Sequence, residues 1–96
     1  MTCMTITTWE LADGTDYEIV LRQVREKRLP ALREMGASRV TVVRTSERTT
    51  AAIIEWPDEM TRDSAEQALQ QVREKIHAED LSRLTGEMGG EVVAQI

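Results

Sequence analysis

Residues 39–45 (RVTVVRT) and 49–56 (TTAAIIEW) are the stretch of sequence that decides the fold. Both runs are rich in β-branched and apolar residues, which favour extended strands. Only Ser46, Glu47 and Arg48 separate them, and that is a loop of hairpin length. We therefore expect two antiparallel strands joined by a short connection in the middle of the chain.

On the N-terminal side of this hairpin, the sequence predicts a further strand and a long helix. Residues 2–11 (TCMTITTWEL) are again of β type and end at a turn signal. Thr15 precedes Glu18 by three residues, the spacing at which a hydroxyl and a carboxylate cap a helix start. Apolar residues then recur at helical spacing up to Gly36, which predicts a helix of about 20 residues.

Pro30 lies inside this helical pattern. Proline has no backbone N–H, so it removes the hydrogen bond to the carbonyl of Glu26 and costs about 3 kcal/mol in a regular helix. Helices accommodate such a residue by bending. We expect a kink near Arg28.

On the C-terminal side, Asp63 precedes Glu66 at cap spacing, and the apolar pattern that follows predicts a helix over residues 61–77. The apolar positions of residues 81–88 fall out of phase with that helix, which indicates a bend or a short separate helix. Three glycines at positions 86, 89 and 90 then separate it from residues 91–96 (EVVAQI), which we expect to form the last strand.

The predicted order of elements is therefore βαββαβ over one domain, residues 1–96. Two strand-helix-strand units joined by a hairpin give an α+β fold of ferredoxin-like type. In that arrangement a four-stranded antiparallel sheet carries both helices on one face.

The predicted strands are apolar on both sides, although two helices can cover only one face of the sheet. Met4 and Ile6 point one way and Cys3, Trp9 and Leu11 the other. A sheet face open to water would be more polar than this. The alternatives are scattered surface apolar residues or a homodimer formed through the open sheet face, and we favour the homodimer.

Composition narrows the classes of partner. The chain has 96 residues and a formal net charge of −5, so its overall field repels phosphate backbones, and we expect no nucleic-acid partner. No apolar stretch approaches the length of a membrane span, and no signal peptide is visible, so we expect no membrane association. With Cys3 as the single cysteine, a cytoplasmic location fits best.

Two short segments carry a resemblance to a known family. The kinked helix reads Arg28-Leu29-Pro30-Ala31-Leu32, and the third strand ends Glu55-Trp56-Pro57-Asp58. In their place within the βαββαβ order, these segments resemble the dimeric α+β barrel superfamily, particularly its antibiotic-biosynthesis-monooxygenase-like members. The resemblance implies two sheets meeting in a barrel, with a pocket in each subunit between sheet and helices. It also implies that cofactor-independent monooxygenases, haem-degrading enzymes and isomerase-like enzymes are among the relatives.

Four residues are candidates for a site. His77 is the one side chain whose ordinary pKa lies near neutrality, and we carry it as a catalytic candidate against the alternative of a structural histidine. Trp9 and Trp56 lie on strands, with Ile54 on the same side as Trp56, and the three are candidate ligand-binding residues. A packing role is the more frequent one for a strand tryptophan. The chain has no asparagine, which is a departure from the haem-degrading relatives.

The basic residues of the first helix alternate with glutamates, as in Glu18-Arg22-Glu26, which is typical of a solvated helix face. An anion site is the alternative interpretation. The carboxylates near residue 60 come with no histidine or cysteine at ligand spacing, so we expect no metal.

Two functions remain open. The first is a non-catalytic dimeric module that binds either a ligand, such as a small hydrophobic molecule in the pocket between sheet and helices, or a partner protein. The second is a cofactor-independent monooxygenase or isomerase-like enzyme that acts on an aromatic or polyketide-like metabolite. In the second, Trp9 and Trp56 stack on the substrate and His77 or a pocket carboxylate moves a proton. Neither function calls for a cofactor.

Overall fold

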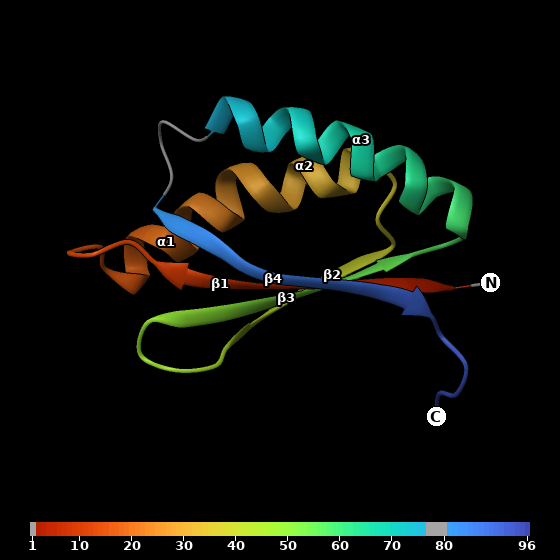
Figure 1. The fold of residues 1–96 in the computed structure, drawn as a ribbon, viewed down its shortest axis with the longest axis horizontal. Helices are drawn as coiled ribbons and strands as arrows, with labels where there is room; N and C mark the ends of the chain where they lie inside the picture. The colour runs from red at the N-terminus through yellow and green to blue at the C-terminus, as the bar shows by residue number, and fades with distance from the viewer. Residues whose placement is uncertain (1, 77–80) are drawn as a thin grey trace.

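The computed structural model describes residues 2–76 and 81–96 of the chain. In chain order its elements are β1 (Cys3–Leu11), α1 (Tyr17–Gln23), the π-helical turn η1 (Val24–Arg28), α2 (Leu29–Glu34), β2 (Arg39–Arg44), β3 (Thr49–Trp56), α3 (Glu59–Ile76) and β4 (Ser82–Glu91). The four strands form one antiparallel sheet in the order β2-β3-β1-β4. All helical segments lie over the same face of that sheet (Figure 1). The predicted ferredoxin-like α+β fold is confirmed.

The central hairpin forms as expected, with Val43 opposite Ala51 and Arg39 opposite Glu55. Contacts with residues outside the hairpin hold its loop. The hydroxyl of Tyr17 donates to the carbonyls of Ser46 and Thr49, and the guanidinium of Arg48, a loop residue, donates to the carbonyls of Leu11 and Ala12 at the end of β1. These contacts tie the hairpin loop to the junction between β1 and α1.

The long first helix is distorted where the sequence predicts a kink, and the distortion is a π turn. The backbone N–H of Leu29 donates to the carbonyl of Val24, five residues earlier, instead of four. Pro30 follows at once and has no N–H to continue a regular ladder. The cap at the helix start is Asp16, whose side chain accepts from the N–H of Glu18, and Thr15 does not take the predicted role.

The second long helix, α3, begins earlier than predicted. Its first turn is capped by Asp58, whose carboxylate accepts from the backbone N–H of Thr61 over 2.7 Å. The predicted cap, Asp63, instead pairs with Arg62 at 3.2 Å inside the helix. Of the two aspartates near the start of α3, Asp58 and not Asp63 is in position to cap the helix.

The C-terminal prediction was wrong. Residues 82–91 form the edge strand β4, where a bend or short helix was expected, and residues 92–96 lie outside any strand. A β-bulge explains the error, because the register with β1 shifts between Thr8 and Trp9. Leu84 lines the helix face, whereas Met88 pairs with Ile6 of the open face. In a regular strand, Leu84 and Met88 would lie on the same face because they are four residues apart. The bulge puts them on opposite faces, so the sequence lacks the alternation that is typical of a strand.

Gly86, one of the three glycines predicted to separate the elements, lies in β4 where a side chain of the neighbouring strand comes close. A Cβ atom at Gly86 would come within 2.7 Å of the Thr8 hydroxyl oxygen on the neighbouring strand. That distance is shorter than contacts of real side chains, so the close pairing of β4 with β1 favours glycine there.

The core lies between the sheet and the helices, on one side only. Trp56 is completely buried, and its indole N–H donates to the Thr5 hydroxyl over 2.9 Å. Buried residues of β1, β3, α2 and α3 surround it: Cys3, Ile54, Leu32 and Ala65. A second cluster packs α1 against the end of β1.

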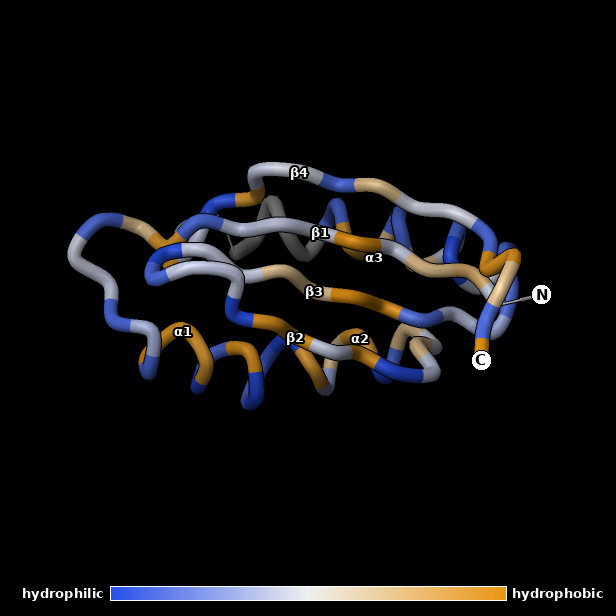
Figure 2. The backbone as a smooth tube through the Cα atoms, turned by 90° about the horizontal axis from the view of Figure 1, so that it is seen from below, coloured by the Kyte–Doolittle hydropathy of each residue, from blue (hydrophilic) through white to orange (hydrophobic). Residues whose placement is uncertain are grey.

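Among the described residues, no helix covers the opposite face of the sheet, as the sequence predicts. Thr41, Ile53, Ile6 and Met88 are aligned across the four strands in one row of that face. Figure 2 views the sheet from this side and shows hydrophobic segments along β2, β3 and β1 in front of the helices. The apolar row is therefore a property of the folded sheet.

The buried pair of Trp56 and Thr5 can be tested by a double-mutant cycle. Trp56→Phe removes the indole N–H and part of a buried ring, and we expect it to lower the free energy of unfolding by about 2–3 kcal/mol. Thr5→Val should cost less in the Trp56→Phe protein than in the wild type, by about 1 kcal/mol, because the hydroxyl has already lost its partner. Urea unfolding of the four proteins measures the coupling, and strictly additive effects would contradict it.

The Asp58 cap predicts a pH effect. The N–H of Thr61 stabilises the charged carboxylate, so the pKa of Asp58 is lower in the folded protein than its ordinary value. This stabilisation is present above the unfolded-state pKa and is lost as pH falls through the folded-state pKa. Asp58→Asn keeps an acceptor that does not titrate. We expect the stability difference between wild type and Asp58→Asn to narrow between neutral pH and about pH 2 in urea unfolding.

Candidate functional site

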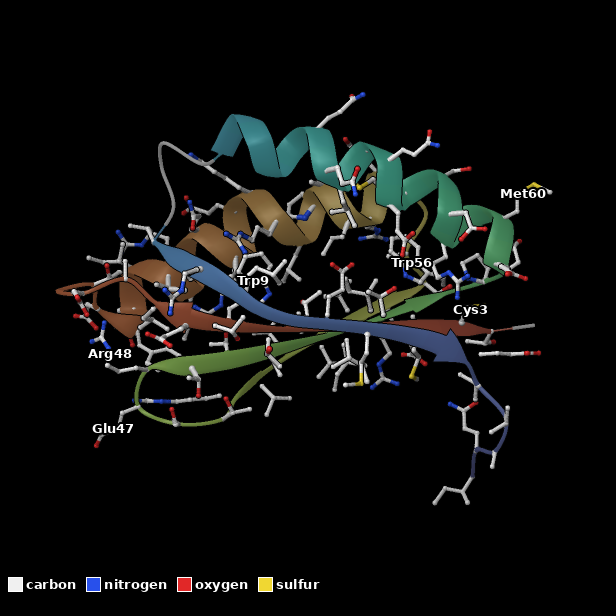
Figure 3. All side chains as sticks on the ribbon, viewed as in Figure 1. Cys3, Trp9, Glu47, Arg48, Trp56 and Met60 are labelled. Atoms are coloured by element: carbon white, nitrogen blue, oxygen red, sulfur yellow. The ribbon has the colours of Figure 1, made fainter. Side chains whose placement is uncertain are left out.

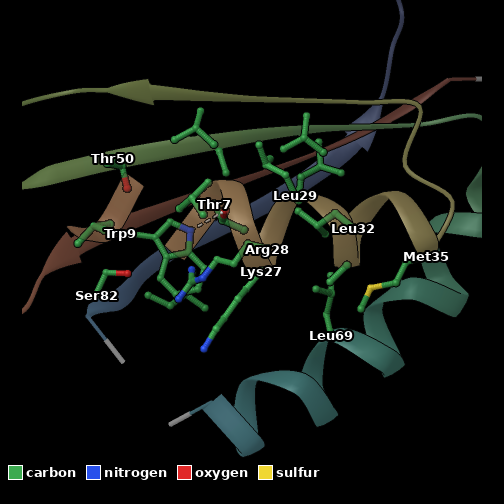
Figure 4. Close-up of a pocket in the computed structure, with 18 of the residues that line it drawn as sticks. Thr7, Trp9, Lys27, Arg28, Leu29, Leu32, Met35, Thr50, Leu69 and Ser82 are labelled. Carbon is green, nitrogen blue, oxygen red and sulfur yellow. Dashed lines mark hydrogen bonds between the residues drawn. The ribbon is translucent and has the colours of Figure 1, made fainter. Parts of the chain in front are cut away.

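A cavity of about 400 Å³ lies between the helix face of the sheet and the segment formed by α1, η1 and α2 (Figure 4). Every strand contributes to its walls, and α3 contributes Leu69. The residues that line it are Thr7, Trp9, Val20, Val24, Lys27, Arg28, Leu29, Ala31, Leu32, Met35, Val40, Val42, Thr50, Ala52, Ile54, Leu69, Ser82, Arg83 and Leu84. Most of these side chains are apolar.

The cavity exists because small side chains on the sheet face a widened stretch of helix. Thr7, Thr50 and Ala52 lie on neighbouring strands and fill little of the space above them. Opposite them is η1, where the chain makes one wider turn because of Pro30. Together these features leave a cavity in the layer between sheet and helices. The same layer also contains the two packed core clusters.

Trp9 forms one wall of the cavity. Its indole N–H donates to the Thr7 hydroxyl over 2.9 Å, which holds the ring across the sheet. The guanidinium of Arg28 lies over the ring, 4.5 Å from its centroid. The Trp9 ring is half-buried and forms part of the cavity lining.

The polar groups of the lining are hydroxyls and cations. Thr7, Thr50 and Ser82 supply hydroxyls, and Lys27 and Arg28 supply positive charge. Among the described residues that line the cavity, none is a carboxylate or a histidine. Such a lining can bind an apolar body and fix the orientation of a polar group, but its hydroxyls are poor general bases at neutral pH.

The structure separates the predicted site residues. Trp9 and Ile54 both line the cavity. Trp56 lies outside its lining, in the core beneath the start of α3, and Figure 3 shows both tryptophans on the helix side of the sheet. His77 falls outside the described residues. A role for any of them in ligand binding or catalysis stays a prediction.

Sequence reasoning underrated Lys27 and Arg28. Their alternation with glutamates indicated a solvated helix face, yet both residues line the cavity and Arg28 is half-buried against Trp9. A signal was present in Pro30, whose effect on the preceding turn changes which residues face the sheet.

Over residues 2–76 and 81–96, no three or more histidine, cysteine, aspartate or glutamate side chains gather where a metal ion could be held. Within the same residues, no helix is both long and apolar enough to cross a membrane. Cys3 is a buried thiol in the Trp56 core.

Comparison with known proteins gives likeness of structure alone. No protein-family model and no curated protein matches the sequence. A dimeric ferredoxin-like protein from an uncultured marine organism is 13% identical, with a TM-score of 0.74, and the match covers 99% of this chain and 98% of that one. A variant of SnoaB, a cofactor-independent oxygenase from Streptomyces nogalater, is 15% identical at a TM-score of 0.72, covering 99% and 96%. An ethyl tert-butyl ether D family protein from Bacillus halodurans is 18% identical at 0.65, covering 97% and 100%.

The chain has a ferredoxin-like fold, which it shares with these solved structures. The resemblance seen in its sequence is thereby confirmed for the fold. Activities are grafted onto folds through their sites, so the likeness does not transfer a reaction. The cavity has to be judged on its own residues.

The cavity predicts an effect on stability. Ala52→Leu adds carbon atoms that point into the space, and we expect it to raise the free energy of unfolding by about 1–2 kcal/mol. Ala51→Leu makes the same change on the other face of the sheet, so its effect reports on that open face and not on the cavity. Urea unfolding at one protein concentration compares them. A loss of more than about 1 kcal/mol in Ala52→Leu would mean that the walls cannot accept the added volume.

Proposed function

We propose that this protein binds a small hydrophobic molecule in the cavity beneath η1, and that it does so as a homodimer. The observation that carries the proposal is a largely apolar space of about 400 Å³ bordered by the fixed ring of Trp9. Ligand pockets span roughly 300–1,000 Å³ and combine apolar walls with a few polar groups. This cavity belongs to the small end of that range, so it suits a compact ligand of one or a few rings.

The homodimer is supported by the uncovered face of the sheet. Ile6, Ile53 and Met88 form a continuous apolar row there, and Met88 on the edge strand is 66% exposed. An apolar face without cover in its own chain is stabilised by a partner, and for identical chains a two-fold axis makes one face serve both. One of the similar solved structures is named as a dimeric ferredoxin-like protein, which agrees with this arrangement.

The C-terminal residues add to the same surface. Residues 92–96 leave β4 on the side of the open face (Figure 1), and Val93 is 90% exposed. A second copy against the sheet would give these apolar side chains a place to pack.

A second candidate is catalysis in the same cavity, as a cofactor-independent monooxygenase or isomerase-like enzyme acting on an aromatic or polyketide-like metabolite. The likeness to SnoaB favours it, because that protein is named as a cofactor-independent oxygenase. The lining favours binding over catalysis, since its described residues lack a carboxylate or histidine to move a proton. The cytoplasm is the compartment that fits the single cysteine of either candidate.

Ligand binding is tested first by native mass spectrometry of freshly purified protein, then with the neutral dye N-phenyl-naphthylamine. We expect the dye to bind with enhanced fluorescence, and Ala52→Leu to weaken it about tenfold or more by filling its place. Ala51→Leu should bind as the wild type does. Equal binding by all three proteins would show that the dye does not occupy the cavity. A retained ligand whose mass changes in air without added cofactor would favour the enzyme.

The dimer is tested with two matched methionines. Met88→Asp places a charge in the open face, and we expect it to weaken self-association at least tenfold because the charge would be buried without a partner. Met60→Asp makes the same change on the outer side of α3, where Met60 is 79% exposed, and should leave association unchanged. Sedimentation velocity over a concentration series measures both. A wild type that stays monomeric at micromolar concentration would refute the dimer.

A further inference from the structure

We propose that buried hydroxyls on the sheet side of the cavity form a polar subsite, in which Thr50, Thr7 and Ser82 hold oxygen atoms of an uncharged ring compound that carries a carbonyl group. This inference rests on the proposed function and narrows it to a class of ligand. It assigns ligand-binding roles to three residues that the sequence did not single out.

The first argument is the burial of hydroxyls that the fold does not use. Four polar side chains are buried in the described part of the chain: Thr5, Thr7, Thr50 and Ser82. The first two accept from the indole N–H groups of Trp56 and Trp9, respectively. Thr50 and Ser82 are only 6% and 3% exposed and both line the cavity, and among the described residues neither hydroxyl has a hydrogen-bond partner. A buried hydroxyl without a partner destabilises a fold, so such a group in a cavity wall points to a bound molecule.

The second argument is the arrangement of the three hydroxyls around Trp9. Thr50 of β3 is directly opposite Trp9 of β1, and Thr7 is the diagonal neighbour of Thr50 on the same face. Ser82 of β4 is opposite Leu11, on the other side of β1. Figure 4 shows Thr50 and Ser82 on either side of Trp9. A ring compound that lies along the indole can therefore place an oxygen at either of two polar points.

The third argument is the hydrogen-bonding capacity of these groups. The Thr7 oxygen already accepts from the indole N–H of Trp9 over 2.9 Å, so its own O–H is left to donate. The hydroxyls of Thr50 and Ser82 can donate as well. A carbonyl oxygen has two lone pairs and accepts such bonds without carrying charge. The walls around the three hydroxyls are mostly apolar, which suits the ring part of the same molecule.

The charges of the lining favour an uncharged polar group. Arg83 is paired with Glu10 at 3.4 Å, and Arg28 lies over the Trp9 ring, 4.5 Å from its centroid. Lys27 also has a partner within the protein. An ionised ligand group would have to compete with these partners, and burying a charge without a partner costs far more than burying a carbonyl.

The experiment compares two ring compounds of nearly the same shape. Acetylnaphthalene carries a carbonyl, and isopropenylnaphthalene has a CH₂ group in place of the carbonyl oxygen. Their affinities are measured by displacement of N-phenyl-naphthylamine. Thr50→Val with Ser82→Ala removes two of the hydroxyls at little change in shape. We expect this double variant to bind the ketone about three- to tenfold more weakly than the wild type does, because a hydrogen bond is lost. The alkene should bind to it at least as tightly as to the wild type.

Infrared difference spectroscopy of the bound ketone reports on the bond itself. A hydrogen bond to a carbonyl oxygen lowers its stretching frequency. We expect a lower frequency in the wild type than in the double variant, which a change in packing alone would not produce. Water is the alternative partner of the two hydroxyls and of the carbonyl, and a frequency that is the same in both proteins would indicate it.

Three single variants control for folding and for position. Thr41→Val makes the same chemical change on the open face, where Thr41 is exposed and lies outside the lining, and it should bind both compounds as the wild type does. Thr50→Val should leave the urea midpoint of the ligand-free protein unchanged or raise it, because its hydroxyl serves no protein partner. Thr7→Val should lower that midpoint, because the indole N–H of Trp9 loses its acceptor.

The outcomes separate this inference from the proposed function. If the double variant binds both compounds as the wild type does while Ala52→Leu weakens both, the hydroxyl subsite is refuted and binding in the cavity stands. An unchanged stretching frequency in the double variant also overturns the subsite. If the wild type binds neither compound, or if Ala52→Leu leaves both unaffected, binding in the cavity itself fails. Selective weakening of the ketone in the double variant, with Thr41→Val unchanged, supports the inference.

Discussion

The arrangement of this protein depends on the fact that a four-stranded sheet has two faces and the chain has helices for one. Alternation along each strand sends Ile54 and Trp56 toward the helices and Ile53 away from them. The helix side becomes a closed core that also contains the cavity. The other side has an uncovered apolar row, which is why we propose a second copy as its complement. Core, cavity and proposed association surface are all consequences of one sheet covered on one side.

Pro30 accounts for the distortion of the first long helix. Proline lacks a backbone N–H donor, and the helix continues through the π turn η1 and past Pro30 without a break. Residues of η1 line the same cavity as the small residues Thr50 and Ala52 of β3. The wide helical turn and the small strand side chains therefore both leave space there. A cavity that arises from backbone geometry is less easily lost by repacking of side chains than one that arises from a missing methyl group.

The sequence was sufficient for the elements whose signals are local, and it failed where pairing between distant segments decides. The central hairpin, the faces of β1 and the distortion before Pro30 follow from alternation and from proline chemistry. Strand β4 was missed because its bulge opposite Thr8 puts Leu84 and Met88 on opposite faces, and because Gly86, which looks like a breaker in the sequence, is favoured in the strand by the nearby Thr8 hydroxyl. For the site, Trp9 and Ile54 were placed on strands correctly. Lys27 and Arg28 were not recognised as lining residues, since only the packed helix shows which residues of η1 face the sheet.

The proposed binding in the cavity and the proposed association through the open face depend on different side chains. They use alternate residues of the same strand, so Ala52 and Ile54 belong to the cavity while Ala51 and Ile53 belong to the open face. No side chain of β3 serves both surfaces, and any coupling between ligand and partner must pass through the backbone of the sheet. A central strand hydrogen-bonded on both sides is a stiff element with few alternative positions. We therefore expect ligand affinity to be nearly the same in monomer and dimer, which would make the second copy a source of stability rather than a part of the site.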